Sequence, residues 1–175
     1  CPAGTFSGVS STVPCEPCPV GTNASGTGST ACGACAAGMY QGQTGSTGCL
    51  ECGAGTYTDL AGLSACRPCP IGLHNDKPSA DRCVKCDIYG TFYTSSQAGS
   101  TACDACLATH YRNLAQVPQC VECVADSMDC GKRTSITLPT LRLQQGYHRA
   151  THSTDVSYIK RCPNADSCEG GAAVG

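Results

Sequence analysis

The stretch CPVGTNASGTGSTACGAC (18–35) holds one full period of the pattern that decides the fold of this 175-residue chain. Its cysteines follow the spacing C-x13-C-x2-C, and the same spacing recurs every 17 residues. One later repeat is three residues longer, so that about seven repeats extend over residues 1–123. A fixed period too short for an independent domain predicts a tandem array in which each repeat packs against its neighbours.

All 18 cysteines are candidates for disulfide bonds: Cys1, Cys15, Cys18, Cys32, Cys35, Cys49, Cys52, Cys66, Cys69, Cys83, Cys86, Cys103, Cys106, Cys120, Cys123, Cys130, Cys162 and Cys168. Within a repeat, we expect the two widely spaced cysteines to pair, because the loop between them can close locally and bring their Cα atoms within about 7 Å. The expected bonds are Cys1–Cys15, Cys18–Cys32, Cys35–Cys49, Cys52–Cys66, Cys69–Cys83, Cys86–Cys103 and Cys106–Cys120. An interlaced ladder, for example Cys15 to Cys35, repeats equally well and stays open.

Two glycine positions and one aromatic position keep the same period. Glycine stands at the fourth position of most repeats and again four residues before the second cysteine, as Gly21 and Gly28 do in the second repeat. Glycine at fixed offsets indicates two tight turns with positive φ in each repeat. We expect the aromatic rings that follow the first turn to pack as a ladder over the disulfides; they are Phe6, Tyr40, Tyr57 and Phe92.

The chain has too few large apolar side chains to form a large hydrophobic core. The chain has no tryptophan, two phenylalanines and seven tyrosines, against 21 glycines and 10 prolines. Buried apolar surface contributes about 25 cal/mol per Å², and loops rich in Gly, Ser and Thr offer little of it. A disulfide that closes a loop of about 15 residues contributes about 3 kcal/mol. Since disulfides persist only in an oxidising compartment, we expect the chain to be extracellular or at the cell surface.

Zinc binding is the rival explanation of the cysteines. The pairs Cys15/Cys18 and Cys32/Cys35 form C-x2-C-x13-C-x2-C, close to the spacing of a zinc ribbon. In a continuous ladder, however, each C-x2-C would have to serve two sites. The 18 cysteines also divide into pairs but not into groups of four. We therefore expect no metal and no cofactor.

The strings CPAGTF (1–6), CPVGT (18–22), CGAGTY (52–57) and CPIGL (69–73) resemble the cysteine-rich repeats named after ephrin receptors. A single repeat is also similar to the first cysteine loop of a tumour-necrosis-factor-receptor module. The resemblance covers residues 1–123 and implies an extracellular array, as in receptor ectodomains, secreted matrix proteins and large surface proteins of protists and algae. The later repeats depart from the pattern, with His74 at the aromatic position and Thr109-His110 in place of Gly-Thr.

Residues 124–175 leave the period and form a predicted C-terminal β-rich segment. Alternating apolar residues predict two short strands followed by a turn at Gly146; they are Ile136, Leu138, Leu141 and Leu143. We expect the bonds Cys123–Cys130 and Cys162–Cys168, since shorter loops close at lower entropic cost, although four cysteines allow three connectivities. The segment is similar to those that follow such repeats in large protist surface proteins, and the chain is expected to continue into further modules of a longer protein.

The predicted fold class is thus a small disulfide-rich protein: an elongated tandem array of short β-hairpin-like cysteine loops, followed by the β-rich segment. At about 10 Å per repeat, seven repeats would form a rod of about 70 Å. Eleven basic and 13 acidic residues give a formal charge of −2 without a basic stripe, so nucleic acid is not an expected partner.

Few motifs point to a chemical site. Asn23 begins the sequon Asn-Ala-Ser on a predicted loop and is a candidate for N-glycosylation. His148 and His152 are four residues apart and could share a helix face around a metal, but Gly146 and the strand-rich surroundings favour a strand or loop. No catalytic constellation is present, so we expect no enzyme.

Two non-enzymatic functions remain. The first is a structural spacer, a disulfide-stapled rod within a larger surface or filament-forming glycoprotein, such as a flagellar hair (mastigoneme) or a coat protein by analogy. The second is the ligand-binding ectodomain of a receptor. Loop tips that carry Gly, Ser and Thr favour the spacer, because binding surfaces concentrate their energy in Trp, Tyr and Arg. The expected partners are proteins, through self-assembly or neighbouring extracellular modules, and glycans, with a membrane only through the rest of the parent protein.

Overall fold

The computed structural model describes residues 1–8, 14–113, 119–130, 136–137, 141–149 and 159–162. The chain divides into two compact units. The first unit comprises Cys1–Lys85 with Gln97–Ala102, and the second comprises Cys86–Ser96 with Cys103–Gly175. The domain boundary expected at residue 123 stays a prediction. We number the seven repeats by their first cysteines, which are Cys1, Cys18, Cys35, Cys52, Cys69, Cys86 and Cys106.

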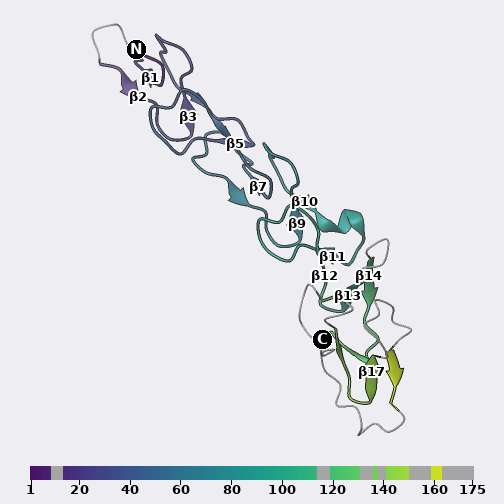
Figure 1. Cartoon of the computed structure of the whole chain (residues 1–175). Helices are drawn as coiled ribbons and strands as arrows, with labels where there is room; N and C mark the ends of the chain where they lie inside the picture. The colour runs from purple at the N-terminus through teal and green to yellow at the C-terminus, as the bar shows by residue number, and fades with distance from the viewer. Residues whose placement is uncertain (9–13, 114–118, 131–135, 138–140, 150–158, 163–175) are drawn as a thin grey trace. The chain divides into compact units, whose positions relative to one another are not determined.

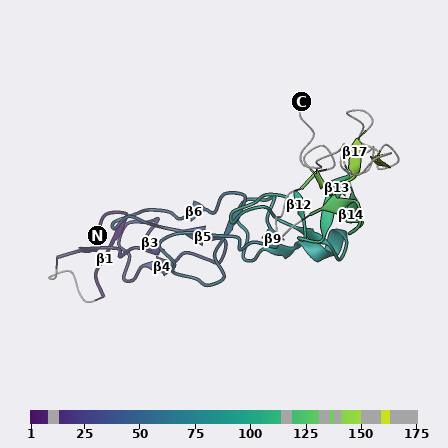
Figure 2. The same cartoon turned by 90° about the horizontal axis from the view of Figure 1, so that it is seen from below.

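The described part of the first unit consists of two-residue strands that pair as antiparallel hairpins, one in each of repeats one to five. The pairs are β1 (Thr5–Phe6) with β2 (Glu16–Pro17), β3 (Thr22–Asn23) with β4 (Gly33–Ala34), β5 (Met39–Tyr40) with β6 (Leu50–Glu51), β7 (Thr56–Tyr57) with β8 (Arg67–Pro68), and β9 (Leu73–His74) with β10 (Val84–Lys85). Within this unit the hairpins follow one another in chain order in both views (Figures 1 and 2). The predicted array of disulfide-linked hairpins is therefore confirmed.

Each hairpin is built by the same local contacts. In the second repeat, Gly21 takes φ +79° at the first turn, and the Thr22 N–H donates to Pro19 O at 3.1 Å. Gly28 takes φ +73° at the second turn. The Cys35 N–H then donates to Gly21 O at 2.9 Å and closes the loop. Both turns that the glycine pattern predicts are thus present, because only glycine adopts positive φ without a steric cost.

The disulfides join the two widely spaced cysteines of each repeat. Their Cα atoms lie 5.3 to 5.8 Å apart in all seven repeats, and Cys123 pairs with Cys130. Local closure therefore holds, and the interlaced ladder does not form. The cysteines proposed above as a zinc-ribbon alternative are all in disulfides. The expected Cys162–Cys168 bond involves Cys168, which lies outside the described residues, and stays a prediction.

Backbone hydrogen bonds join each repeat of the first unit to the next. The first-turn glycine donates forward, as Gly21 N–H does to Gln41 O at 2.7 Å. The second-turn residue donates backward, as Gly45 N–H does to Cys18 O at 2.7 Å. A third bond, such as that from Ala24 N–H to Ser46 O at 3.1 Å, recurs in the same register. The hairpins therefore form one continuous hydrogen-bonded array.

Contacts also reach past the nearest neighbour. The backbone of Gly4 lies directly against the carbonyl of Gly45, two repeats further on, and Gly21 lies in the same way against Gly62. Gly45 itself lies near Pro17, again two repeats away. A repeat is thus held by the next repeat and by the one after it.

Burial in the first unit falls mostly on cysteines and polar residues. The first cysteine of each repeat from the second to the fifth is 0–1% exposed: Cys18, Cys35, Cys52 and Cys69. Phe6, Tyr40 and Tyr57 are only half-buried, and that they cover disulfides stays a prediction. The residue after the aromatic position is buried instead, as Thr58 (0% exposed) shows.

The second unit begins with a short 3-10 helix and continues in antiparallel pairs. Its elements are η1 (Cys86–Tyr89), β11 (Tyr93–Thr94) with β12 (Ala105–Cys106), β13 (His110–Asn113) with β14 (Gln119–Glu122), β15 (Met128–Asp129) with β16 (Arg142–Leu143), and β17 (Tyr147–Arg149) with β18 (Ile159–Arg161). A small hydrophobic cluster forms its core, and its buried members are Tyr111, Met128, Cys130, Ile136 and Leu141.

Two features of the second unit bear on the sequence predictions: the turn at Gly146 and the position of the Phe92 ring. Gly146 takes φ +88° at the turn before β17, as the pattern predicts, whereas Leu138 lies outside the described residues. Phe92 does not join the expected ladder. The three extra residues of repeat six place the strand at β11, so that Phe92 precedes it, is 43% exposed and stacks on His110 instead.

Candidate functional site

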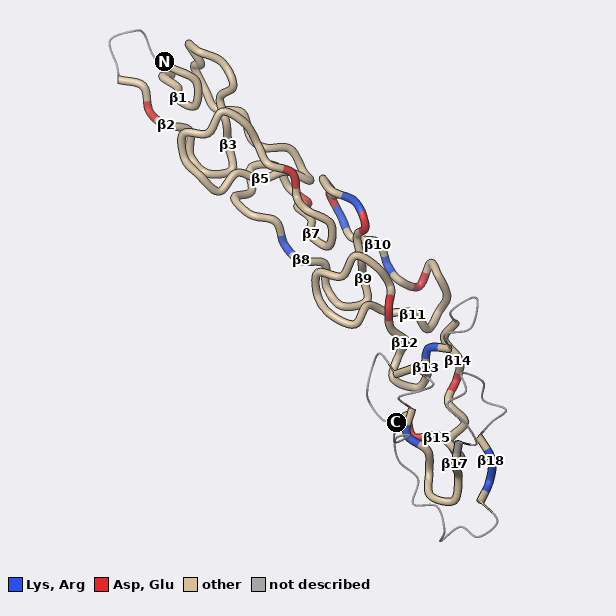
Figure 3. Tube along the Cα trace, viewed as in Figure 1, with Lys and Arg blue, Asp and Glu red and all other residues tan. Residues whose placement is uncertain are grey.

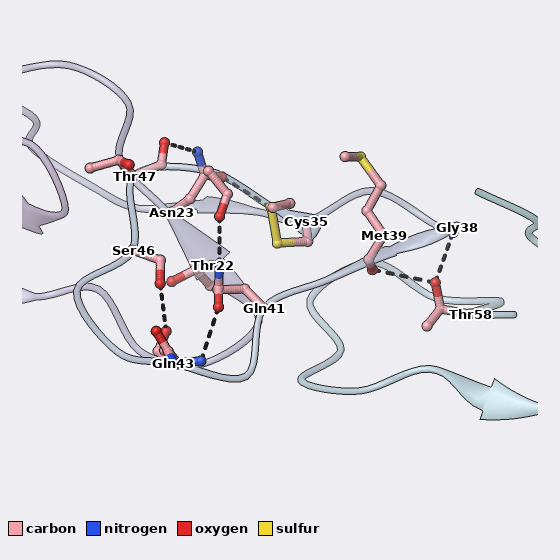
Figure 4. Close-up of a disulfide and its surroundings, with 12 residues drawn as sticks. Thr22, Asn23, Cys35, Gly38, Met39, Gln41, Gln43, Ser46, Thr47 and Thr58 are labelled. Carbon is pink, nitrogen blue, oxygen red and sulfur yellow. Dashed lines mark hydrogen bonds between the residues drawn. A yellow bond between two sulfur atoms is a disulfide. The ribbon is translucent and has the colours of Figure 1, made fainter. Parts of the chain in front are cut away.

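The candidate site of the first unit is the contact between neighbouring repeats. It consists of the described residues whose side chains bond one repeat to the next. Figure 4 shows them around the disulfide of the third repeat, where side chains of repeats two, three and four meet. These residues come from the hairpin strands, from the positions directly after them and from the loop of the third repeat. The sequence period therefore brings the same side-chain position to the same place in every repeat.

Asn23 lies at the end of β3 and bridges to the next repeat. Its Nδ2 donates to Thr47 O at 3.2 Å, and its Oδ1 lies 3.3 Å from Cys49 Sγ (Figure 4). Because Cys49 is in a disulfide, its sulfur carries no proton, and this second approach is a polar contact rather than a hydrogen bond. The predicted glycosylation residue is therefore half-buried and engaged. Its glycosylation stays a prediction.

Buried polar side chains follow the aromatic position in successive repeats. Thr58 Oγ1 accepts from Gly38 N–H at 2.7 Å and donates to Met39 O at 3.3 Å (Figure 4). Asn75 Nδ2 donates to Thr56 O at 3.1 Å and to Lys77 O at 2.8 Å. A buried polar group is costly unless it is hydrogen-bonded, so these bonds allow polar residues to act as the core of the array.

Gln41 occupies the same position in the third repeat and binds its own loop. Its Nε2 donates to Gly48 O at 2.7 Å, and its Oε1 accepts from Gln43 N–H at 3.0 Å (Figure 4). The sequence pattern contained a signal for this row, because Ala24, Gln41, Thr58 and Asn75 are separated by 17 residues. We did not predict the row, since polar residues in a Gly- and Ser-rich loop are ordinarily exposed.

In the second unit, Asp104 joins the two strands of the sixth hairpin. Its carboxylate accepts from Ser96 Oγ at 2.6 Å and from Ser96 N–H at 2.8 Å. Partial burial raises the pKa of the Asp104 carboxyl, but the Ser96 hydrogen bonds and the charge of Arg112 outweigh it. The pKa of Asp104 is therefore lowered from its ordinary value.

Of the two histidines four residues apart, the structure describes only His148. His148 lies on β17, which agrees with the expected strand, and its Nδ1 is 3.4 Å from Cys162 Sγ. His152 lies outside the described residues. Within those residues, no helix has the length and hydropathy to cross a membrane.

The comparison with known families agrees with this geometry. A family model described as "Tyrosine-protein kinase ephrin type A/B receptor-like" matches residues 21–62, about a quarter of the chain. The match runs from the first-turn glycine of the second repeat to the second-turn glycine of the fourth. No curated protein matches the chain. Residues 21–62 are therefore a cysteine-rich module of the ephrin-receptor-like kind, which is a non-catalytic type of module, and the disulfides that staple the array favour an extracellular setting.

Proposed function

We propose that this chain is a non-enzymatic extracellular spacer, a stiff segment of a larger surface or filament-forming glycoprotein. The observation that carries this proposal is the unbroken register of inter-repeat bonds. From Gly4 to Gly55, each first-turn glycine donates to the next repeat and lies against the repeat after that.

Stiffness follows from these contacts. Bending the array between two repeats would break backbone hydrogen bonds to the next repeat and separate the glycine from the carbonyl two repeats on. A disulfide in each hairpin prevents the repeats themselves from extending. A flexible linker rich in Gly and Ser has neither restraint and behaves as a random coil. The array therefore fixes a distance, which is what a spacer requires.

The surface of the first repeats also supports a spacer or filament. Between residues 1 and 58 the only charged side chains are Glu16 and Glu51, and Figure 3 shows the sparse charge from β1 to β5. Net charge far from zero keeps proteins apart in solution. A nearly uncharged array lacks that repulsion, which favours lateral packing of copies in a filament or coat.

A receptor ectodomain is the second candidate. One observation favours it: repeat six exposes large side chains, with Ile88 at 65% and Tyr89 at 58% exposed. The regular repeats expose single apolar residues only at scattered positions, and their loops carry mostly Gly, Ser and Thr.

The spacer is tested by lengthening the array. Two extra repeats, copied from residues 35–68, would be inserted after residue 68, so that the contacts to the second neighbour are preserved. We expect the maximum dimension from small-angle X-ray scattering to increase by about 20 Å, at about 10 Å per repeat, with no loss of thermal stability. An unchanged dimension, or a broad distribution of dimensions as for a random coil, would contradict the proposal.

A further inference from the structure

Repeat six departs from the other repeats in a way that creates a pocket. Its three additional residues lie between Cys86 and β11, in the stretch that forms η1 and the following turn, and three aromatic residues meet there: Tyr89, Phe92 and Tyr93. These rings and Gln119 at the start of β14 line an open pocket of about 320 Å³. The pocket lies entirely within the second compact unit.

The ring of Phe92 is held in place from one side. It stacks on His110 with centroids 3.8 Å apart and an interplanar angle of 17°. His110 is 5% exposed, whereas Phe92 is 43% exposed. The stack therefore covers one face of the Phe92 ring and leaves the rest of the ring toward solvent as a rigid apolar platform.

The backbone at Gly90 shapes the same pocket. Gly90 has φ +142°, and a β-carbon there would lie 3.1 Å from two atoms of the Tyr93 ring. Glycine therefore lets the Tyr93 ring pack against the main chain. Because the rings of Phe92 and Tyr93 are both held in place before a ligand binds, little side-chain entropy is lost on binding.

The lining selects a class of ligand. Among the described residues it comprises three aromatic residues, Thr91 and Gln119 beside Gly90 and Cys120, and no lysine, arginine, aspartate or glutamate. A charged ligand would find no opposite charge among these residues. The negative face of an aromatic ring attracts partially positive C–H groups, and an amide both donates and accepts hydrogen bonds. A pyranose ring matches both features, because it has a C–H face and a rim of hydroxyl groups.

We propose that the pocket of repeat six binds a neutral carbohydrate, with one sugar ring on Phe92 and its hydroxyl groups at Gln119. The volume is at the low end for small-molecule sites, which fits one or two sugar rings. The pocket is open and shallow, so we expect dissociation constants in the millimolar range. The proposal is independent of the spacer function, since a spacer with this pocket would also attach to glycans of its surroundings.

The test is an NMR titration of the intact chain with three neutral probes: a disaccharide of N-acetylglucosamine, a mannose trisaccharide and a glucose trisaccharide. We expect at least one of them to shift the amide signals of residues 89–93 and 119–120 selectively. Phe92→Ala and Tyr89→Ala should each weaken binding at least tenfold, whereas Phe92→Tyr should retain it. Leu60→Ala, which shortens a 60% exposed side chain of repeat four, is the matched control.

Folding of the variants is checked by the signals of the second unit away from the pocket, such as those of Met128 and Leu141 in its hydrophobic cluster, which should not move. The proposal is overturned if none of the probes shifts these amides at 20 mM, or if Phe92→Ala binds as well as the wild type. A proline-rich decapeptide is titrated in parallel, because extended proline segments also dock on aromatic surfaces. Binding of the peptide with no binding of the sugars would replace the carbohydrate by a protein partner.

Discussion

The carbonyl oxygen of Ser79 occupies the space that a β-carbon on Gly38 would need, although the two residues are 41 positions apart in the chain. The same relationship joins Gly4 to Gly45 and Gly55 to Gly99. The first-turn glycine is therefore required twice, once for its positive φ and once for the approach of a backbone two repeats away. A model with contacts only between nearest neighbours does not describe this array.

Gly38→Ala should loosen repeats three to five. An alanine at φ +82° costs about 1–2 kcal/mol, and its β-carbon would also displace the Ser79 carbonyl. We expect a loss of at least about 2 kcal/mol, which is about 30-fold faster hydrogen exchange. The amides to follow are those of Cys52, which donates to Gly38 O, and Ser79, which donates to Cys52 O.

The control for this change is Gly48→Ala, because a β-carbon on Gly48 meets no atom within 4 Å. It should leave the exchange of both amides within a factor of three. Equal effects of the two substitutions would show that the contact to the second neighbour contributes nothing.

Ser79→Gly should stabilise the fifth repeat. Ser79 occupies the second-turn position with φ +57°, where repeats two, three and four have glycine. A left-handed conformation costs a non-glycine residue about 1–2 kcal/mol, and the larger folding entropy of glycine offsets about half of that. We expect a gain of about 0.5–1 kcal/mol, measured as slower exchange of the Ser79 amide position relative to the wild type. The reverse change, Gly62→Ser, should cost a similar amount, and a loss of stability in Ser79→Gly would contradict this account.

The sequence predicted the parts of the fold that depend on local closure. Pairing within repeats follows from a fixed loop length with two turns, and the structure has it at Cys18–Cys32 and in every other repeat. The same reasoning placed the turn at Gly146, because a glycine between alternating segments marks a change of direction. These features need only neighbours in sequence.

Features that depend on packing between repeats were not predicted. The period of 17 residues fixes which positions are equivalent, but not which of them face the next repeat. The motif drew attention to the aromatic position, but not to the position after it, which carries the buried hydrogen bonds at Thr58 and Asn75. Phe92 was misplaced because a three-residue insertion shifts the strand to β11, and the motif alone does not show where the insertion is absorbed.

Two substitutions separate the structural role of Asn23 from its sequon. Ser25→Ala removes the glycosylation signal and leaves the Asn23 bond to Thr47 O intact, whereas Asn23→Ala removes both. We expect exchange of the Ala24 amide, which donates to Ser46 O, to be at least fivefold faster in Asn23→Ala than in Ser25→Ala. In a secreting host that attaches N-glycans, glycosylated wild type should also exchange faster than Ser25→Ala, because a sugar on Nδ2 crowds a half-buried contact. Equal exchange in all three forms would refute the role of Asn23 as a bridge.

Asp104 gives the second unit a dependence on acid. The pKa of its carboxyl is lower in the folded chain than its ordinary value, so the Ser96–Asp104 contact stabilises the fold above the unfolded pKa of about 3.9. That contribution is lost as the pH falls through the folded pKa. The NMR shift of the Ser96 amide should therefore titrate with a midpoint below 3.8. In Asp104→Asn this transition should be absent, and a midpoint above 3.8 in the wild type would contradict the prediction.

Reduction should abolish the resistance of the folded chain to proteolysis, whereas chelation should leave it unchanged. Eight disulfides link sixteen of the described cysteines, and the buried side chains of the first unit are mostly cysteines and polar residues. A core this small cannot hold the hairpins once the loops are open, so a thiol reductant should abolish resistance to proteolysis in both units. A strong chelator should leave that resistance unchanged, because the cysteines that would bind zinc are already paired with one another. Structural zinc contributes folding energy outright, so loss of resistance on chelation alone would show that the native cysteines bind metal and that the extracellular assignment is wrong.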